Sequence, residues 1–494
     1  MLVVISDLHL TDGTATSTLH PGAMHLFIQQ MRDLAERAGW RLNGRYQPIE
    51  RLDLVLLGDT LDIINSRRWL ETGIRPYGSN SSTEMVQVTA DIVDEILRQN
   101  QPTLQLIRAL VSDEIITVAP ASQSGQPMTM QAGIPVAVRT HYVVGNRDWM
   151  LRLKGNGYDL IRQRISHHLG LANAYNQPFP HDASESEELL EALRRHRSYA
   201  RHGDIFDPLS FSGDRDVASI SDAMVIELFC TFMQTITEQM SDSLSPTVIQ
   251  QLSEIQHIRP TVVAPVYIDG ILQRCCTSPA QRKQVQRVWD SCVENLLSLP
   301  MLREQETINS LQVVDGLDCC LSFRRRLANG WSDQSRQWTQ QTRGATSPSF
   351  VQHAIAEQDF RNRRARHIIY GHTHHVEQIP LDASHADGFV LNQMYFNTGT
   401  WRRNYQPIQI PGSEQEFIGT ESMSIVALYQ GDERSGRSFE TLSGTLGIVS
   451  NSSISGSEKT TTSEKSVPTP RRIPGESPSS IIRTSIAAGD TVMY

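Results

Sequence analysis

The chain has 494 residues, enough for two or three domains or for one large domain with an insertion. Charged residues make up 20% and hydrophobic residues 39%, the ordinary balance of a globular protein. A net charge of −9 argues against broad nucleic-acid binding and leaves room only for a local basic groove. No apolar run approaches membrane-spanning length, and the N-terminus leads directly into a strand and does not resemble a signal peptide, so we expect a cytoplasmic protein.

The first predicted element is a short strand over residues 2–5, followed by two polar residues of metal-binding type, Asp7 and His9. If the backbone stays extended, residues two apart point the same way, so these side chains can converge beyond the strand. Open α/β sheets place their sites at that end of the strands. A carboxylate beside an imidazole suits manganese, iron or zinc.

The same rhythm of strand, polar tip and helix continues through the next part of the chain. A strand over residues 52–57 leads into Gly58-Asp59-Thr60-Leu61-Asp62, and a strand over 136–144 ends in Gly145-Asn146-Arg147-Asp148. Helices are predicted from apolar spacing over residues 21–38, 84–98 and 103–111. This alternation predicts an α/β fold whose site lies on the loops.

A fourth polar segment, at residues 198–204, contains His202, and beyond it the alternation of strands and helices stops. Residues 220–361 carry helical patterns over 223–240, 246–255, 280–298 and 304–327, with almost no strand signal. The strands return at 367–370, before Gly371-His372-Thr373-His374, and again at 389–397 and 424–429. We therefore expect a core over residues 1–215 and 366–449, a helical insertion over 216–365, and a disordered Ser/Thr/Pro-rich tail over 450–494.

The cysteines show no metal-binding pattern. None of the six is spaced as Cys-x-x-Cys, and all lie in the central helical region. We expect them to be buried thiols without chemistry.

Taken together, the polar tips resemble the calcineurin-like metallophosphoesterase family. The family pattern is Asp-x-His, Gly-Asp-x-x-Asp, Gly-Asn-His-Asp/Glu, His and Gly-His-x-His, and the tips match it in the same order. The resemblance covers residues 1–205 and 366–431 and omits the helical insertion and the tail. It implies a four-layer α/β/β/α sandwich with a large helical insertion.

The resemblance also implies a dinuclear metal centre, most simply of Mn²⁺, with iron or zinc as alternatives. One cation would take Asp7, His9, Asp59 and His374, and the other Asp59, Asn146, His202 and His372. Two cations about 3.5–4 Å apart can clamp the attacking and leaving oxygens of an in-line displacement at phosphorus. The expected reaction is attack by a metal-bridging hydroxide on a phosphodiester or pyrophosphate bond.

Each of these residues also has a plainer interpretation. Asp7 could cap a turn, Asn146 could be a turn residue, and His202 could be a buried histidine with ordinary partners. His202 is preferred over the other nearby histidines because it directly precedes Gly203-Asp204. Asp62, Asp148 and Asp204 are expected to orient the ligands, and Asp62 could equally be a turn residue.

The chain departs from the family at Arg147, where most members have histidine. Arginine cannot donate a proton to a leaving oxygen, but it can stabilise negative charge on a phosphoryl group. Arg147 and its neighbour Asp148 are therefore the catalytic candidates, and a leaving group that needs little protonation is expected. Gly-Asn-Arg-Asp with a later His-Gly-Asp resembles the UDP-2,3-diacylglucosamine diphosphatase branch, which implies a phosphorylated small-molecule or nucleotide-lipid substrate.

Two other functions stay open from the sequence. One is a broader phosphodiesterase acting on nucleotides or nucleic-acid ends, and the other is a non-catalytic binding module on the same fold. Basic stretches at residues 324–326 and 361–366 suit contact with a phosphate-rich substrate or with an anionic membrane surface. A solvated helix face explains both stretches more simply.

Overall fold

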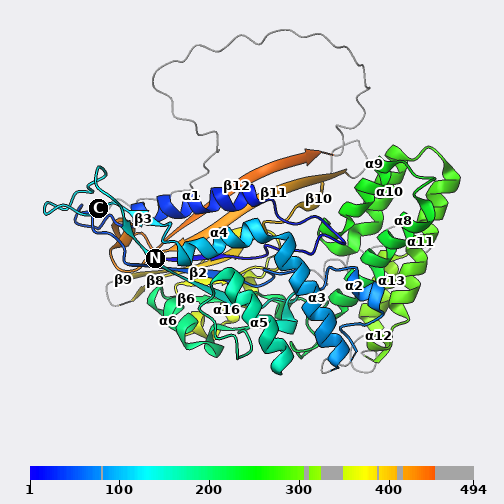
Figure 1. Ribbon diagram of the computed structural model, residues 1–494, viewed down its shortest axis with the longest axis horizontal. Coiled ribbons are helices and arrows are strands. Elements are labelled where there is room, and N and C mark those ends of the chain that lie inside the picture. The colour runs from blue at the N-terminus through cyan, green and yellow to red at the C-terminus, as the bar shows by residue number, and fades with distance from the viewer. Residues whose placement is uncertain (79–81, 305–310, 324–348, 387–388, 409–415, 451–494) are drawn as a thin grey trace, which may run out of the picture.

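In the computed structural model, two β-sheets form the centre of the molecule, and helices cover their outer faces (Figure 1). The structure describes residues 1–78, 82–304, 311–323, 349–386, 389–408 and 416–450. The fold is mixed α/β, as expected. The tail expected over 450–494 lies outside the described residues, apart from Ser450, and so does the basic stretch at 324–326.

The larger sheet has the strand order β10-β11-β1-β2-β5, with β12 paired to β11. Its strands are β1 (Leu2–Ile5), β2 (Arg51–Leu57), β5 (Ala137–Val143), β10 (Asn404–Ile408), β11 (Glu416–Leu428) and β12 (Phe439–Ser450). β1 pairs in parallel with β2, and β2 with β5, so the carboxyl ends of all three meet at one edge. Both β1 and β2 are buried on two faces, which explains their continuous apolar sequences. The sequence did not indicate β10 or β12.

The smaller sheet has the order β6-β7-β9-β8. Its strands are β6 (Ser198–Ala200), β7 (His367–Tyr370), β8 (Val376–Ala386) and β9 (Phe389–Thr398). β6, β7 and β9 are parallel, whereas β8 runs antiparallel to β9. The carboxyl ends of β6 and β7 therefore also lie side by side. A separate two-stranded ribbon joins β3 (Thr117–Val118) to β4 (Ile134–Pro135).

The two sheets face each other through a shared apolar cluster. Val4 and Val55 of the larger sheet pack there with Ile369 and Phe396 of the smaller one. The cluster is closed by α6 (Glu187–Arg195), which buries Leu189, Ala192 and Leu193. Burying this apolar surface holds the sheets, and with them the two sets of strand ends, in a fixed relation.

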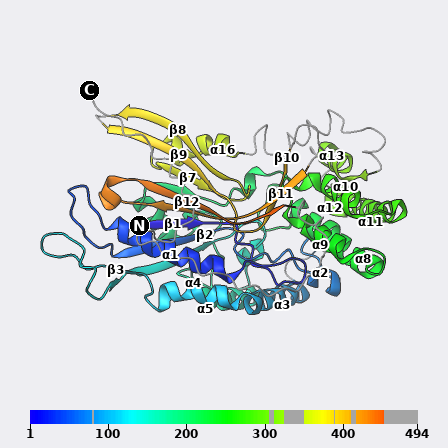
Figure 2. The same cartoon turned by 90° about the horizontal axis from the view of Figure 1, so that it is seen from above.

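Helices cover the outer face of each sheet (Figure 2). The larger sheet packs against α1 (Pro21–Ala38), α3 (Thr83–Gln99), α4 (Gln101–Ser112) and α5 (Asn156–Leu169). Phe27 of α1, Ile92 of α3 and Ile107 of α4 are fully buried in this layer. The helices at 21–38, 84–98 and 103–111 were predicted from sequence, whereas α5 and the short α2 (Arg68–Thr72) were not. On the smaller sheet, α16 (Val351–Ala356) buries Ala354 beside Ile368 and Tyr395.

A block of helices occupies one end of the sheets (Figures 1 and 2). It contains α7 (Ile220–Ala223), a π-helical turn (Met224–Cys230), α8 (Thr231–Met240), α9 (Pro246–Ser253), α10 (Ala264–Cys275), α11 (Pro279–Leu297), α12 (Pro300–Glu304) and α13 (Leu311–Leu321). The pattern over 304–327 lies partly outside the described residues. Beyond this block, α16 and α17 (Gln358–Arg361) follow Phe350, which packs on the smaller sheet.

Among the described residues, one helical stretch that the sequence analysis had passed over is long and apolar enough, by length and composition, to cross a membrane. It runs from Ile220 to Met240, and 67% of its most apolar window is buried inside the molecule. Phe229 and Phe232 contact the indole ring of Trp289 on α11. Within the described residues, this packing makes the stretch the central helix of the block.

Candidate metal centre

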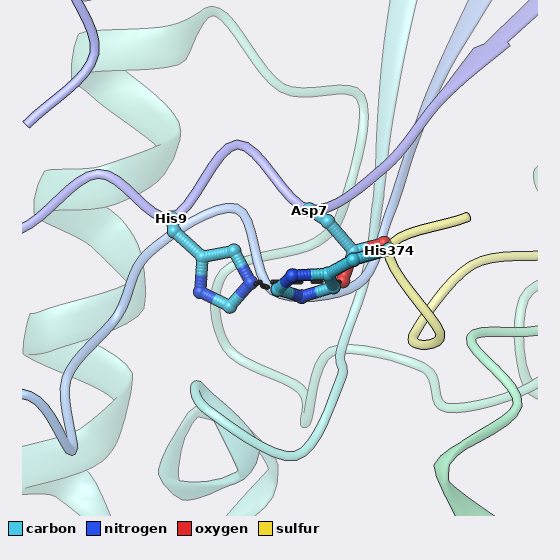
Figure 3. Close-up of side chains that lie close together, drawn as sticks. All are labelled: Asp7, His9 and His374. Carbon is cyan, nitrogen blue, oxygen red and sulfur yellow. Dashed lines mark hydrogen bonds and ion pairs between the residues drawn. The ribbon is translucent and has the colours of Figure 1, made fainter. Parts of the chain in front are cut away.

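Five strand ends bring potential metal ligands to one place. Their side chains form two groups, Asp7 with His9 and His374, and Asp59 with His202 and His372. Within each group, the ligand atoms all lie within 4.8 Å of one another. The first group joins the loops after β1 and β7 (Figure 3). The second joins the loops after β2, β6 and β7.

In the first group, three ligand atoms face each other closely. Nε2 of His9 lies 3.0 Å from Nε2 of His374. Oδ1 of Asp7 lies 3.6 Å from the His9 nitrogen and 3.4 Å from the His374 nitrogen. All three residues are buried.

Asp59 lies between the two groups. Its Oδ2 is 3.4 Å from Nε2 of His202 and 3.8 Å from Nε2 of His9. Asn146 belongs to the second group, because its Oδ1 is 3.0 Å from Nδ1 of His372. The structure thus brings together all seven residues that the sequence indicated as ligands.

The donor set fits a pair of divalent cations. Oδ1 of Asp7 and Nε2 of His202 are buried, and neither has a hydrogen-bond partner among the described residues. Buried polar atoms without a partner are costly, so such a pair within one cluster is the arrangement expected where a cation supplies the missing partner. Mixed imidazole and carboxylate donors suit Mn²⁺, Fe²⁺ or Zn²⁺.

The backbone of this cluster is unusual. Asp7, His9 and Asp59 have φ of 53°, 46° and 49°, and His372 and His374 have φ of 68° and 61°. Left-handed conformations are uncommon for residues other than glycine and cluster at functional sites. The extended backbone expected for Asp7 and His9 is therefore wrong. Two left-handed turns, rather than strand alternation, make their side chains converge.

Glycines next to the ligands allow the loops to approach closely. A Cβ on Gly145 would lie 2.2 Å from Oδ1 of Asp59, and one on Gly371 would lie 2.6 Å from Oδ2 of Asp7. Real Cβ atoms essentially never come this near another heavy atom. Glycine is required at both positions for steric reasons.

Hydrogen bonds fix the orientation of three imidazoles. Nδ1 of His9 pairs with Oδ2 of Asp62 at 3.1 Å, and Nδ1 of His202 pairs with the carbonyl oxygen of Leu57 at 3.1 Å. Nε2 of His372 pairs with Oδ2 of Asp207 at 2.9 Å. Each ring therefore turns its other nitrogen toward the cluster, as outer partners of metal ligands commonly arrange.

Asp207 orients a ligand, whereas Asp204, the aspartate expected from the sequence, does not contact one. Oδ1 of Asp204 instead accepts a hydrogen bond from Arg215 at 2.8 Å. Both aspartates follow His202 in Gly203-Asp204-Ile205-Phe206-Asp207, so the signal was present as a second carboxylate three residues later.

Asp148, a catalytic candidate from the sequence, lies behind the ligands and does not line the cavity beside them. Its carboxylate accepts hydrogen bonds from the backbone N–H of Gly145 at 2.7 Å, from that of Thr60 at 3.2 Å and from the hydroxyl of Tyr142 at 2.5 Å. Burial, with the nearby charge of Asp59, raises the pKa of Asp148 to about 7. Asp148 thus joins the turns after β2 and β5, a positioning function rather than contact with a substrate.

The aspartates and histidines of the cluster strongly affect one another's pKa values. Burial raises the pKa of Asp7, but His202, His374 and His9 outweigh it and hold that pKa well below its usual range. Burial lowers the pKa of His202, but Asp59 and Asp7 outweigh it and raise it to about 10. Carboxylates that hold protons on buried imidazoles exert the same attraction on divalent cations, which compete with those protons for the ring nitrogens.

A cavity of ≈ 340 Å³ opens beside the ligands, between the core and the helical block. Arg147 lines it, and the backbone N–H of Arg147 donates to Oδ1 of Asp59 at 2.8 Å. The guanidinium of Arg147 donates to Oγ of Ser221 on α7 at 2.9 Å and lies 3.6 Å from Oδ1 of Asp222. Arg147 thus links the ligand cluster to the first helix of the block.

Arg402 is a second residue that the sequence analysis did not identify. Its Nη1 donates to Oδ2 of Asp62 at 3.0 Å, and its Nε donates to Nδ1 of His257 at 2.8 Å. Oγ1 of Thr400, two residues before Arg402, donates to the carbonyl oxygen of Asp7 at 2.9 Å. No motif in the sequence indicated Arg402.

The six cysteines are free thiols, and none belongs to either ligand group of the described residues.

Neither the scan against models of protein families nor the search of curated proteins finds a match. The geometry of the ligand cluster and its cavity therefore carries the functional argument.

Proposed function

We propose that this chain is a calcineurin-like metallophosphoesterase, a hydrolase of phosphodiester or pyrophosphate bonds that depends on two divalent cations. The observation that carries the proposal is the pair of buried ligand groups with Asp59 between them. Random burial of histidines and aspartates does not produce two adjacent groups on five strand ends. Two facing sheets with helices on both outer faces also suit the α/β/β/α sandwich of that family.

Under this proposal each ligand has a defined assignment. One cation would be held by Asp7, His9, Asp59 and His374, and the other by Asp59, Asn146, His202 and His372. When bound, such cations polarise a phosphoryl group and lower the pKa of water. The protein's own contribution is to hold the imidazoles in fixed orientations through Asp62, the Leu57 carbonyl and Asp207.

Arg147 decides which leaving groups the site accepts. A guanidinium offers hydrogen-bond donors in a planar fork, so this side chain is suited to bind phosphoryl oxygens rather than to act as the general acid. No histidine stands at this position to protonate an alkoxide. We therefore propose that the phosphate of an anhydride leaves more readily than an alkyl alcohol does, which favours pyrophosphate linkages of the nucleotide-sugar-lipid type.

The test is a hydrolysis screen of the purified full chain with added Mn²⁺. Its substrates are a bis-aryl phosphate, an aryl monophosphate, nucleoside-diphosphate sugars and UDP-diacylglucosamine. We expect activity on the diester or the anhydrides and its loss in His374→Ala, with His25→Ala, an exposed histidine on α1, as the matched control. Equal activity of wild type and His374→Ala would refute the proposed metal mechanism.

A further inference from the structure

One segment of the helical block, Ile258–Val262, borders the cavity beside the ligands, and its residues Arg259 to Val262 line that cavity. It is fixed to the core by backbone pairing, because Ile258 forms a parallel bridge with Tyr405 and the N–H of Arg259 donates to the Tyr405 carbonyl at 3.0 Å. The preceding residue, His257, accepts from Arg402 and pairs through Nε2 with Oγ1 of Thr16 at 2.8 Å. The position of Arg259 is therefore set by the core that also carries the ligands.

Arg259 is a cation without a matching anion. Its Nη1 donates to the carbonyl oxygens of Gln256 at 3.1 Å and Ile258 at 2.9 Å, and no carboxylate of the described residues lies within ion-pair distance. By contrast, Arg147 lies 3.6 Å from Asp222, and Arg402 lies 3.0 Å from Asp62. A half-buried guanidinium that borders a cavity and has donors to spare is suited to bind an anion there.

Arg259 shares its cavity with the ligand cluster. Asp59, His372 and His374 line the same cavity as Arg259. An anion bound there can therefore meet the Arg259 guanidinium and the ligand cluster at the same time.

We propose that Arg259 binds a second phosphate of the substrate, next to the phosphate at the ligand cluster, so that the preferred substrates are diphosphate anhydrides. This inference rests on the proposed hydrolase function. The guanidinium fork can donate two parallel hydrogen bonds to phosphate oxygens. Leu209, Val262 and Phe350 line the same cavity and offer an apolar surface to the group that the diphosphate carries.

The test compares two substrates in the presence of Mn²⁺. Bis(p-nitrophenyl) phosphate has one phosphorus, whereas UDP-glucose has a diphosphate. We expect Arg259→Ala to lower kcat/KM about 10- to 100-fold for UDP-glucose, mainly through KM, and less than about threefold for the bis-aryl ester. Arg259→Lys should fall between, and Arg274→Ala, which changes an exposed arginine on α10 of the same helical block, should match wild type. An equal fall on both substrates, or no change on either, would overturn the proposal.

A binding measurement separates this inference from the proposed hydrolysis. By titration calorimetry with inorganic pyrophosphate and Mn²⁺, wild type should bind at least tenfold more tightly than Arg259→Ala, and thermal unfolding should confirm that the variant is folded. If wild type binds pyrophosphate through Arg259 but hydrolyses neither substrate, the hydrolase fails and the anion site stands. If it hydrolyses the bis-aryl ester but neither binds nor hydrolyses diphosphates, the anion site fails.

Discussion

The hydrogen bond between Asp207 and His372 offers the sharpest test of the ligand geometry. Oδ2 of Asp207 lies 2.9 Å from Nε2 of His372, and this contact leaves Nδ1 facing the second ligand group. Replacing Asp207 by alanine frees the imidazole to rotate. Because His372 belongs only to the second group, the variant should lower the affinity for one cation and leave the affinity for the other unchanged.

The magnitude follows from the type of contact and from its exposure. A hydrogen bond to a charged group contributes about 1.5–3 kcal/mol, which corresponds to roughly 10- to 100-fold in affinity. Loss of an outer partner of a metal ligand has effects in the same range. The Asp207 side chain is 25% exposed, so solvent screens part of its charge, and we expect about a tenfold loss.

The assay is equilibrium titration of the metal-free protein with Mn²⁺, in which electron paramagnetic resonance counts the free ion. Asp207→Ala should show two binding steps, one unchanged and one about tenfold weaker. Asp204→Asn is the matched control, since Asp204 pairs with Arg215 rather than with a ligand. The reasoning would be refuted if Asp207→Ala lowered the affinity for both cations equally, if it lowered neither, or if Asp204→Asn caused the same loss of affinity.

Three further predictions concern the cavity, the turns and the fold. Arg147→Ala should lower kcat about 10- to 100-fold and leave the amount of bound Mn²⁺ unchanged. Ser221→Ala removes the hydroxyl that accepts a hydrogen bond from the Arg147 guanidinium, and it should have a smaller effect in the same assay. Gly145→Ala should abolish binding of at least one cation in a Mn²⁺ titration, because the added methyl would lie 2.2 Å from Oδ1 of Asp59; normal binding would show that the turn can move aside. Burial lowers the pKa of His196 from 6.5 to about 4, so the unfolded chain takes up a proton before the folded one as the pH falls between these values. Stability to urea should therefore fall by about 2 kcal/mol between pH 8 and pH 5 through this group, and His196→Asn should reduce the fall; an unchanged pH dependence would refute the assignment.

The candidate ligands could be predicted from the sequence because each lies in a short motif directly after a strand. All seven expected ligands lie in two adjacent groups. The residues that hydrogen-bond to these ligands, or to their partners, were harder to predict. Asp207 contacts His372 and Arg402 contacts Asp62, and both contacts join loops that are far apart in the sequence. Asp148 looked catalytic from its place in Gly145-Asn146-Arg147-Asp148, but burial decides its role, and burial depends on the packed fold.

The fold was predictable where one face or both faces of an element are apolar. The periodicity over residues 21–38 matched α1 at both ends, and the buried run at 52–57 matched β2 to within a residue. By contrast, β12 lacks a regular alternation of apolar and polar residues and contains two glycines, and its pairing along β11 defines it as a strand. The helix α10 was not predicted, although Ala264, Ile268 and Leu272 recur at helical spacing on its buried face.

Because β1 lies in the middle of its sheet, it can gain both neighbouring strands only late in synthesis of the chain. His9 and His374 are 365 residues apart, and β1 gains its second neighbour only when residues 426–428 pair with it. At about 5–20 residues per second, a ribosome needs roughly 20–70 s to pass from the first of these ligands to the last. The nascent chain therefore has an open edge at β1 for most of its synthesis. Under the proposed assignment, the group of Asp7, His9 and His374 could bind a cation only after residue 374 has been synthesised.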